Sequence, residues 1–145
     1  MTMLAWSAGL AVVAGLALLL LRRRLAVVVV SGVSMEPAFH ASDRLLVRRA
    51  GLSRLAVGDI VVFARPRRYD GEELLPVEDR WMVKRVAALP GDPVPDAVLP
   101  AVAEQRVAEG RLVVLGDNPA ASYDSRQFGF LPADLLLGVV LRRMS

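Results

Sequence analysis

Residues 81–92, "WMVKRVAALPGD", predict a single strand that ends in a tight turn. The first nine of these residues are mostly apolar, and the Pro-Gly-Asp triplet that follows is a turn signal that interrupts a central strand. Because side chains alternate along a strand, Met82, Lys84 and Val86 share one face. The pattern therefore predicts an amine that is carried among apolar neighbours.

The segments on either side have the same organisation of short β-like runs separated by Gly, Pro and Asp. These runs cover residues 25–30, 45–47, 59–63, 111–115 and 135–141. Residues 65–79 and the proline-rich residues 92–100 are expected to be loops, and residues 101–110 a helical turn or two. This spacing predicts a mainly β fold, a compact sheet or partial barrel, rather than alternating βαβ units.

The N-terminal segment differs from this β domain because residues 3–21 carry no charge. As a helix they would reach about 28 Å, close to the hydrocarbon thickness of a bilayer. Three arginines, residues 22–24, follow this run, and Trp6 near its start suits a membrane interface. A cleavable secretory signal is the alternative, but it requires a basic start and a shorter apolar core. We therefore expect one transmembrane anchor with a basic flank over residues 1–24 and a separate domain over residues 25–145.

The composition argues against several kinds of site. The chain has no cysteine and one histidine, His40, so disulfides, thiolate chemistry and Cys- or His-based metal centres are not expected. The formal net charge is +3, but the basic residues are spread among acids without interleaved aromatic residues, which argues against nucleic-acid binding. A role of the arginines at a membrane surface is the better interpretation. Neither a metal nor an organic cofactor is expected.

Lys84 stands out because the other 17 of the 18 basic residues are arginines. A guanidinium stays protonated in proteins, whereas an amine can lose its proton once it is desolvated. Burial disfavours the charged amine, and a neutral lysine can take a proton from a hydroxyl and so act as a general base. A chance substitution would leave the same composition, so this interpretation depends on a suitable hydroxyl nearby.

Ser34 is the candidate hydroxyl, because it follows an apolar run in "VSGVSMEP", residues 30–37. Gly32, two residues earlier, lets the backbone approach a substrate closely and present N–H groups to an oxyanion. The alternative interpretation is an ordinary surface turn, which this segment alone would favour.

Four ordered segments, "SGVSMEP", "VGDIVVF", "WMVKRVAALPGD" and "GDNPAASYDSRQFGF", resemble the type I signal peptidases, the Ser/Lys serine proteases of the bacterial membrane. The resemblance covers nearly all of the β domain and implies a signal-peptidase-like catalytic fold. It implies that Ser34 is the nucleophile and Lys84 the general base. It also implies that Ser122 hydrogen-bonds the lysine amine, and that an ion pair of Asp124 and Arg126 holds its segment against the site.

Gly32 departs from part of this family, in which a serine at the corresponding position donates its hydroxyl to the oxyanion. The oxyanion would then be bound by the backbone N–H of Ser34 and a second donor that the sequence does not identify. His40 is an alternative base, but it lies only six residues from Ser34 within one local segment and is better interpreted as a solvated loop residue. Self-cleavage, as in SOS-repressor-type proteases, is disfavoured. Those proteases cut themselves upstream of the serine, whereas the only Ala-Gly pair of the β domain, Ala50-Gly51, lies downstream of Ser34.

The resemblance implies an endopeptidase that cleaves signal peptides from exported precursors at the outer surface of the plasma membrane. The expected partners are these signal peptides and the lipid bilayer, and a monomer is expected. A lysine rather than a histidine at position 84 implies the bacterial branch of the family. Two alternatives stay open, namely a protease dedicated to one or a few precursors and a membrane-tethered peptide-binding module without turnover. One feature does not fit this orientation. Positive charge tends to stay on the cytoplasmic side, whereas the arginines at residues 22–24 lie on the side of the catalytic domain, which the resemblance places outside.

Overall fold

The computed structural model describes residues 2–66 and 81–144, with residues 2–11 described by their backbone alone. Helix α1 (Thr2–Arg24) precedes a β domain that contains one short helix, α2 (Ser125–Phe128), in the described residues. The strands are β1 (Leu25–Val29), β2 (Arg44–Arg49), β3 (Ile60–Ala64), β4 (Trp81–Ala88), β5 (Arg111–Leu115), β6 (Leu131–Pro132) and β7 (Leu136–Met144). Short 3₁₀ helices lie at Leu52–Arg54, Leu99–Ala101, Pro119–Ala121 and Ala133–Leu135.

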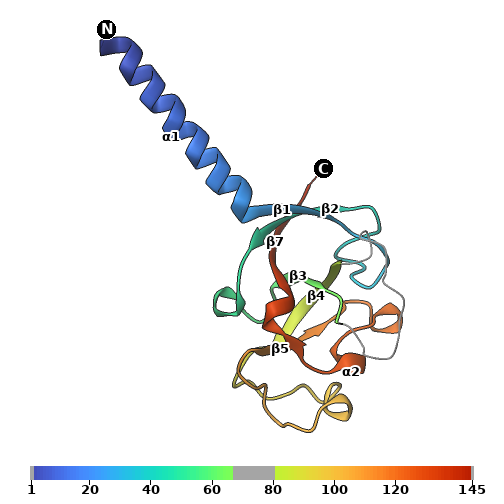
Figure 1. Ribbon diagram of the computed structural model, residues 1–145. Coiled ribbons are helices and arrows are strands. Elements are labelled where there is room, and N and C mark those ends of the chain that lie inside the picture. The colour runs from blue at the N-terminus through green and yellow to red at the C-terminus, as the bar shows by residue number, and fades with distance from the viewer. Residues whose placement is uncertain (1, 67–80, 145) are drawn as a thin grey trace.

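These strands form one antiparallel sheet in the order β1-β2-β7-β3-β4-β5-β6. The last strand of the chain, β7, lies between β2 and β3 and so connects the N-terminal hairpin to the middle of the sheet. The sheet curls, and Figure 1 shows β1 and β2 at one end of the domain with β3, β4 and β5 below them. The mainly β fold that the sequence predicts is confirmed.

The core forms because the strands alternate between inward apolar and outward polar residues. In β2, Leu45 and Val47 are fully buried while Arg44 and Arg48 are exposed. Phe63 of β3 is also fully buried, and burying a side chain of this kind stabilises a fold by about 1.5–3 kcal/mol. This packing fixes the central strands, including β4, which carries the candidate lysine.

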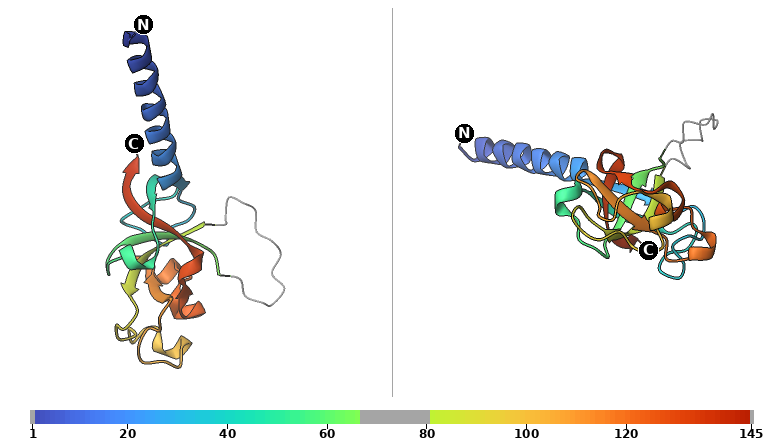
Figure 2. Two further views of the ribbon diagram at one scale, coloured as in Figure 1. Left: turned by 60° about the vertical axis from the view of Figure 1, so that its left-hand side comes forward. Right: turned by 90° about the horizontal axis from the view of Figure 1, so that it is seen from below.

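Helix α1 projects away from the β domain, as Figure 2 shows from two further directions. It ends with three arginines, residues 22–24, and β1 begins at the next residue. Among the residues whose side chains the structure describes, no helix is both long enough and apolar enough to cross a membrane.

All six predicted strands overlap an observed strand, whereas the prediction for residues 101–110 is wrong. These residues form an irregular segment after a single 3₁₀ turn. The N–H of Val94 donates to the carbonyl of Gln105, and the N–H of Val107 donates to the carbonyl of Asp92. Backbone donors thus pair across this loop instead of along a helix. The predicted loop at residues 65–79 lies mostly outside the described residues.

Candidate active site

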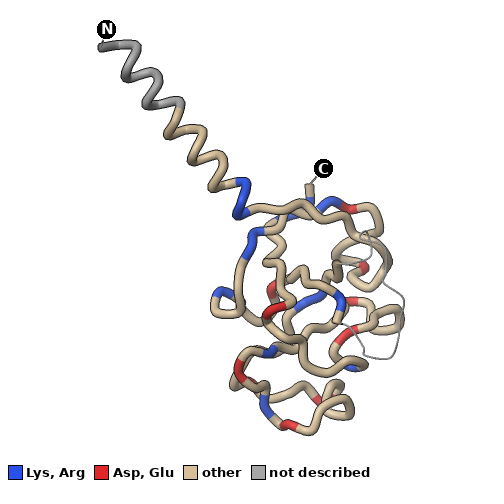
Figure 3. Tube along the Cα trace, in the orientation of Figure 1, with Lys and Arg blue, Asp and Glu red and all other residues tan. Residues whose placement is uncertain are grey.

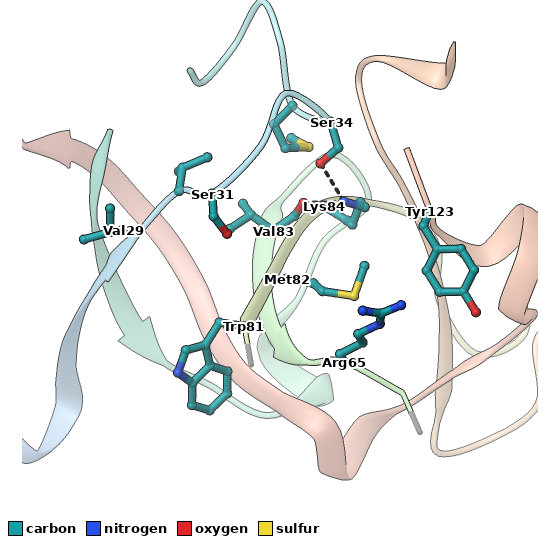
Figure 4. A pocket seen from close by; sticks show the side chains of 11 residues that line it. Val29, Ser31, Ser34, Arg65, Trp81, Met82, Val83, Lys84 and Tyr123 are labelled. Carbon is teal, nitrogen blue, oxygen red and sulfur yellow. Dashed lines mark hydrogen bonds between the residues drawn. The ribbon is translucent and has the colours of Figure 1, made fainter. Parts of the chain in front are cut away.

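Ser34 and Lys84 lie together although 50 residues separate them in the sequence. Lys84 belongs to β4, and Ser34 belongs to the turn that follows β1. The Nζ atom of Lys84 lies 2.7 Å from the Oγ atom of Ser34, and Nζ also donates to the backbone carbonyl of Val83 at 3.2 Å. Figure 4 shows the serine and lysine side chains pointing toward each other at one end of a pocket. We refer to them as the Ser34–Lys84 pair.

The amine of this pair is buried, because the Lys84 side chain is only 3% exposed. Lys84 shares its face of β4 with Met82 and Val86, which pack into the apolar core. Burial lowers the pKa of the Lys84 amine from 10.5 to about 8; the carboxylate of Asp124 opposes this shift and the guanidinium of Arg126 adds to it. The protein therefore carries a neutral amine at mildly alkaline pH.

The turn that carries Ser34 is tied to the segment after β5. The backbone N–H of Asn118 donates to the carbonyl of Ser34 at 3.0 Å, and its side-chain amide donates to the carbonyl of Val33 at 3.2 Å. At the start of the turn, Gly32 has a φ of 95°, a conformation that favours glycine. On the other side of the turn, Met35 is 1% exposed and anchors it in the core. Contacts on both sides thus fix the position of the serine.

Asp124 is fully buried and joins several parts of the site. It accepts hydrogen bonds from the Ser122 hydroxyl at 2.6 Å and from the Gly116 N–H at 2.8 Å. The backbone and the guanidinium of Arg126 donate to the same carboxylate. Burial alone would raise the pKa of the Asp124 carboxyl, but these hydrogen bonds outweigh it and hold the pKa below its ordinary value. The ion pair predicted from the sequence is present, and the carboxylate is charged at neutral pH.

The hydrogen bond of Ser122 differs from the expectation. The resemblance implies a bond between Ser122 and the Lys84 amine, whereas the hydroxyl donates to the Oδ2 atom of Asp124. A charged carboxylate two residues away is the stronger acceptor, which explains this choice. Asp124 in turn favours the protonated form of the Lys84 amine. We therefore infer that the main role of Ser122 is to orient the carboxylate of Asp124.

Gly116 lies where the two segments of the site come closest. A Cβ atom on this residue would lie 2.1 Å from the Oγ atom of Ser122 and 2.8 Å from the carbonyl oxygen of Ser34. We expect Gly116→Ala to displace the serine turn and lower kcat/KM for peptide hydrolysis by about 10²-fold, because a shift of about 1 Å can cost that much. The measurement is steady-state hydrolysis by a variant whose folding is checked by circular dichroism.

Gly51→Ala is the matched control for this prediction. Nothing lies within 4 Å of a Cβ atom built on Gly51, and its φ is −90°, which any residue adopts. This variant should keep its activity within about twofold, because surface substitutions without contacts have small effects. Full activity of Gly116→Ala would show that close packing at this glycine does not position the site.

A second ion pair, between Arg85 and Asp117, was missed by the sequence analysis. The Nε and Nη2 atoms of Arg85 donate to the two carboxylate oxygens of Asp117 at 2.9 and 2.6 Å. Such a bidentate contact fixes both side chains, and here it connects β4 to the segment that holds the serine turn. The two charges come together because the strand register places Arg85 beside Leu115, two residues before Asp117. This register is not visible in the sequence.

A pocket of about 270 Å³ opens beside the Ser34–Lys84 pair. Its lining also includes Ser31, Trp81 and Tyr123, which Figure 4 shows around the opening. One side of the pocket is a sheet edge, since residues 81–84 pair with β3 whereas β5 pairs only with residues further along β4. An extended peptide could therefore reach backbone N–H and C=O groups of β4 next to the pair.

The remaining candidate, His40, is exposed, and its backbone N–H donates to a carboxylate oxygen of Asp43 at 2.9 Å. Among the residues that the structure describes, no group of three or more His, Asp or Glu side chains is arranged to hold a metal ion. The groups gathered at the site are a hydroxyl, a buried amine and a buried carboxylate. This set is suited to acyl transfer through a serine nucleophile.

Comparison with known proteins gives the class of this chain. A protein-family model described as "Signal peptidase, peptidase S26" matches residues 3–96 and 94–144. The chain is 35% identical over 138 residues to a probable signal peptidase I-1 of Synechocystis sp., which covers 76% of this chain and 66% of that protein. It is 30% identical over 122 residues to the mitochondrial ATP-independent inner membrane protease subunit 1a of Arabidopsis thaliana, covering 79% and 67%. It is 28% identical over 147 residues to signal peptidase I of Bacillus caldolyticus, covering 77% and 75%.

These matches define the class as the signal peptidase I-like serine endopeptidases. The chain belongs to the signal peptidase family, peptidase S26. It spans about two thirds of the length of the Synechocystis and Arabidopsis relatives. A lysine at position 84 implies the bacterial branch of the family. The matches include both bacterial and mitochondrial proteins, so they do not distinguish the bacterial branch from the mitochondrial one.

Proposed function

We propose that this chain is a membrane-bound serine endopeptidase that cleaves signal peptides from exported precursor proteins. Ser34 is the nucleophile and Lys84 is the general base. The observation that carries this proposal is the 2.7 Å separation of their Oγ and Nζ atoms, at an amine that is 3% exposed. A desolvated amine beside a hydroxyl is the arrangement in which a lysine can accept the serine proton.

The substrate binds as an added strand along the edge of β4 at residues 81–84. Its backbone N–H and C=O groups pair with those of the edge, and this pairing supports affinity without reading the sequence. Side chains on one face of the added strand enter the pocket of about 270 Å³ beside Ser34, and the family resemblance implies that these side chains are small. The scissile carbonyl then lies over the serine oxygen.

The chemistry proceeds through an acyl-enzyme. The Lys84 amine takes the proton of the Ser34 hydroxyl while Oγ attacks the scissile carbonyl carbon. The resulting ammonium gives that proton to the leaving nitrogen, the C–N bond breaks, and the mature protein departs. A water molecule then loses a proton to Lys84 and attacks the ester, and the proton returns to Oγ as the signal peptide leaves with a free carboxylate.

The backbone N–H of Ser34 serves as one donor to the oxyanion. Asn118 holds the carbonyl oxygens of both Val33 and Ser34. The carbonyl of Val33 and the N–H of Ser34 belong to one planar peptide group, so fixing the first orients the second. Such preorganised donors stabilise the transition state because they need no rearrangement during the reaction.

The uncharged residues 3–21 form the anchor in this proposal, with the catalytic domain on the extracytoplasmic side of the plasma membrane. The orientation is the one that the family resemblance implies. The partners are then the signal peptides of exported precursors and the bilayer that contains the anchor.

The test is cleavage of a purified precursor by the full chain reconstituted in lipid vesicles. We expect two products, with the N-terminus of the mature protein at a single position after a small residue, and no products with Ser34→Ala. A wild-type chain that binds the signal peptide without releasing product would overturn the proposal in favour of a peptide-binding module. A panel of precursors distinguishes a general peptidase from a dedicated one.

The pH dependence of the reaction follows from the lowered pKa of Lys84. The base must be neutral, so kcat/KM should rise about tenfold per pH unit below pH 8 and level off above it. Peptide hydrolysis measured from pH 6 to 10 checks this expectation. A flat profile over this range would contradict the general-base role, and a midpoint near 10.5 would show that the amine is not desolvated in solution.

A further inference from the structure

Positive charge is concentrated at the end of the domain where α1 enters. Residues 22–49 and 136–145 contain eight arginines and two acids, whereas the rest of the chain contains ten basic residues and thirteen acids. Figure 3 shows this basic end at the base of α1, along β2 and near the C-terminus. The net charge of +3 is small, but charge is distributed unevenly and the excess of positive charge lies at this end of the domain.

Three of these arginines lie on one face of the sheet. Leu45 and Val47 of β2 point into the core, so Arg44 and Arg48 on the same strand point outward and are exposed. Arg142 of β7 is also exposed. It lies in register with Leu46, which is midway between Arg44 and Arg48 on β2. Residues paired across antiparallel strands share a face. We call Arg44, Arg48 and Arg142 the basic face.

Exposed apolar residues border the basic face on the neighbouring strand β1. Val27 and Val29 are 48% and 58% exposed, and Val29 lies in register with Arg44. The first residue of β1 lies in register with Arg48 and follows directly on the three arginines at the end of α1. An apolar row, the basic face and the basic end of the helix thus form one continuous surface.

We propose that this surface binds the headgroups of anionic phospholipids, so that the β domain rests on the bilayer from which α1 emerges. Arg44, Arg48 and Arg142 contact the lipid phosphates, and the two valines enter the interface between headgroups and acyl chains. Attachment of this kind combines apolar burial with electrostatic attraction to anionic lipids. The inference rests on the proposed anchor, but it concerns a surface outside the Ser34–Lys84 pair.

Two observations favour lipid over another polyanion. The basic face is continuous with the end of α1, so it lies against a bilayer as soon as the anchor is inserted. Anionic headgroups would also explain why residues 22–24 are tolerated on the side of the domain, where positive charge is unusual. Because Val29 belongs to this surface and also lines the pocket, docking places the pocket close to the membrane.

The test uses the full chain with Leu141→Cys as the only labelling site, since the natural sequence has no cysteine. Leu141 is 47% exposed beside Arg142, so a fluorophore there reports contact with lipids that carry a nitroxide headgroup. Vesicles of phosphatidylcholine are compared with vesicles that contain about 30% phosphatidylglycerol, at about 0.1 M and about 1 M salt, where the screening length falls to about 3 Å.

We expect quenching in the anionic vesicles to be about twofold that in the zwitterionic vesicles at low salt, and to fall to the zwitterionic level at high salt. The triple variant Arg44→Gln, Arg48→Gln and Arg142→Gln should lose this difference. The matched control, Arg54→Gln, Arg106→Gln and Arg111→Gln, removes three exposed arginines elsewhere and should retain it. Hydrolysis of a soluble peptide should be unchanged in both variants, which shows that they are folded.

Quenching that does not depend on lipid charge, or that both variants lose equally, would overturn the inference. So would binding of an RNA oligonucleotide that competes with the vesicles for the basic face with higher affinity. Failure of the anchor is read separately, as loss of flotation with zwitterionic vesicles at high salt. Failure of the catalytic proposal is read as loss of peptide hydrolysis by the wild type, so the outcomes are distinguishable.

Discussion

Lys84→Arg is expected to give a folded protein whose kcat/KM for peptide hydrolysis falls by about 10³-fold or more. An arginine at this position keeps the positive charge but does not release its proton, so it does not accept one from Ser34. Loss of a general base costs about 10²–10⁴-fold, and the reaction proposed here uses the same base in both acylation and deacylation. The measurement is steady-state hydrolysis at pH 9, where the wild-type amine is neutral.

The larger guanidinium could disturb the core, so Lys84→Met is the second variant. Methionine has a similar length and suits the apolar face that Lys84 shares with Met82 and Val86. Both variants should lose activity equally while their circular dichroism stays that of the wild type. Arg54→Lys, an exchange of the same two residue types at an exposed position, should leave activity unchanged. Activity of either Lys84 variant within tenfold of the wild type would rule out its role as the base.

Ser34→Ala is expected to lower kcat by at least about 10³-fold, because in the proposed reaction it removes the atom that forms the acyl-enzyme. Binding of the substrate should change little, since the sheet edge of β4 and the pocket remain in place. Mass spectrometry of the wild type with a slowly deacylating peptide should detect the mass of the acyl group on the chain. The same adduct should be missing in the variant.

Ser31→Ala is the matched control, because Ser31 lines the same pocket without lying in the Ser34–Lys84 pair. It should keep its activity within a few-fold. The double variant Ser34→Ala with Lys84→Met should be no slower than Ser34→Ala alone, since residues that act as one unit are not additive. A further large loss in the double variant would mean that the two side chains act independently.

The sequence predicts the local elements of this fold well. The β-branched runs and their turn residues indicate each of the longer strands, and alternation predicts the face of β4 that carries Lys84. The two-residue strand β6 is too short to leave such a pattern. The order of the strands is not predictable in this way, because β7 lies between β2 and β3 for reasons of packing between distant segments.

The candidate site shows the same limit. The resemblance and the single lysine point to Ser34 and Lys84, and the structure places these residues within hydrogen-bond distance. The contacts of Asn118 with the serine turn and of Arg85 with Asp117 depend on the register between strands, which local patterns do not encode. The hydroxyl of Ser122 donates to the charged carboxylate of Asp124, and the sequence did not indicate this partner. Sequence reasoning therefore identifies reactive groups more readily than the residues that hold them.

The buried amine also has a thermodynamic consequence for the whole protein. In the unfolded chain a lysine titrates near 10.5, whereas the folded protein releases this proton near pH 8. Between these values the unfolded chain binds more protons at this group, so the contribution of Lys84 to the free energy of unfolding rises with pH, and below pH 8 this contribution is about 3 kcal/mol less favourable than above the pKa of the unfolded chain. Near neutrality the enzyme thus retains a smaller margin against denaturation, because its reactive group must give up hydration to remain ready for proton transfer.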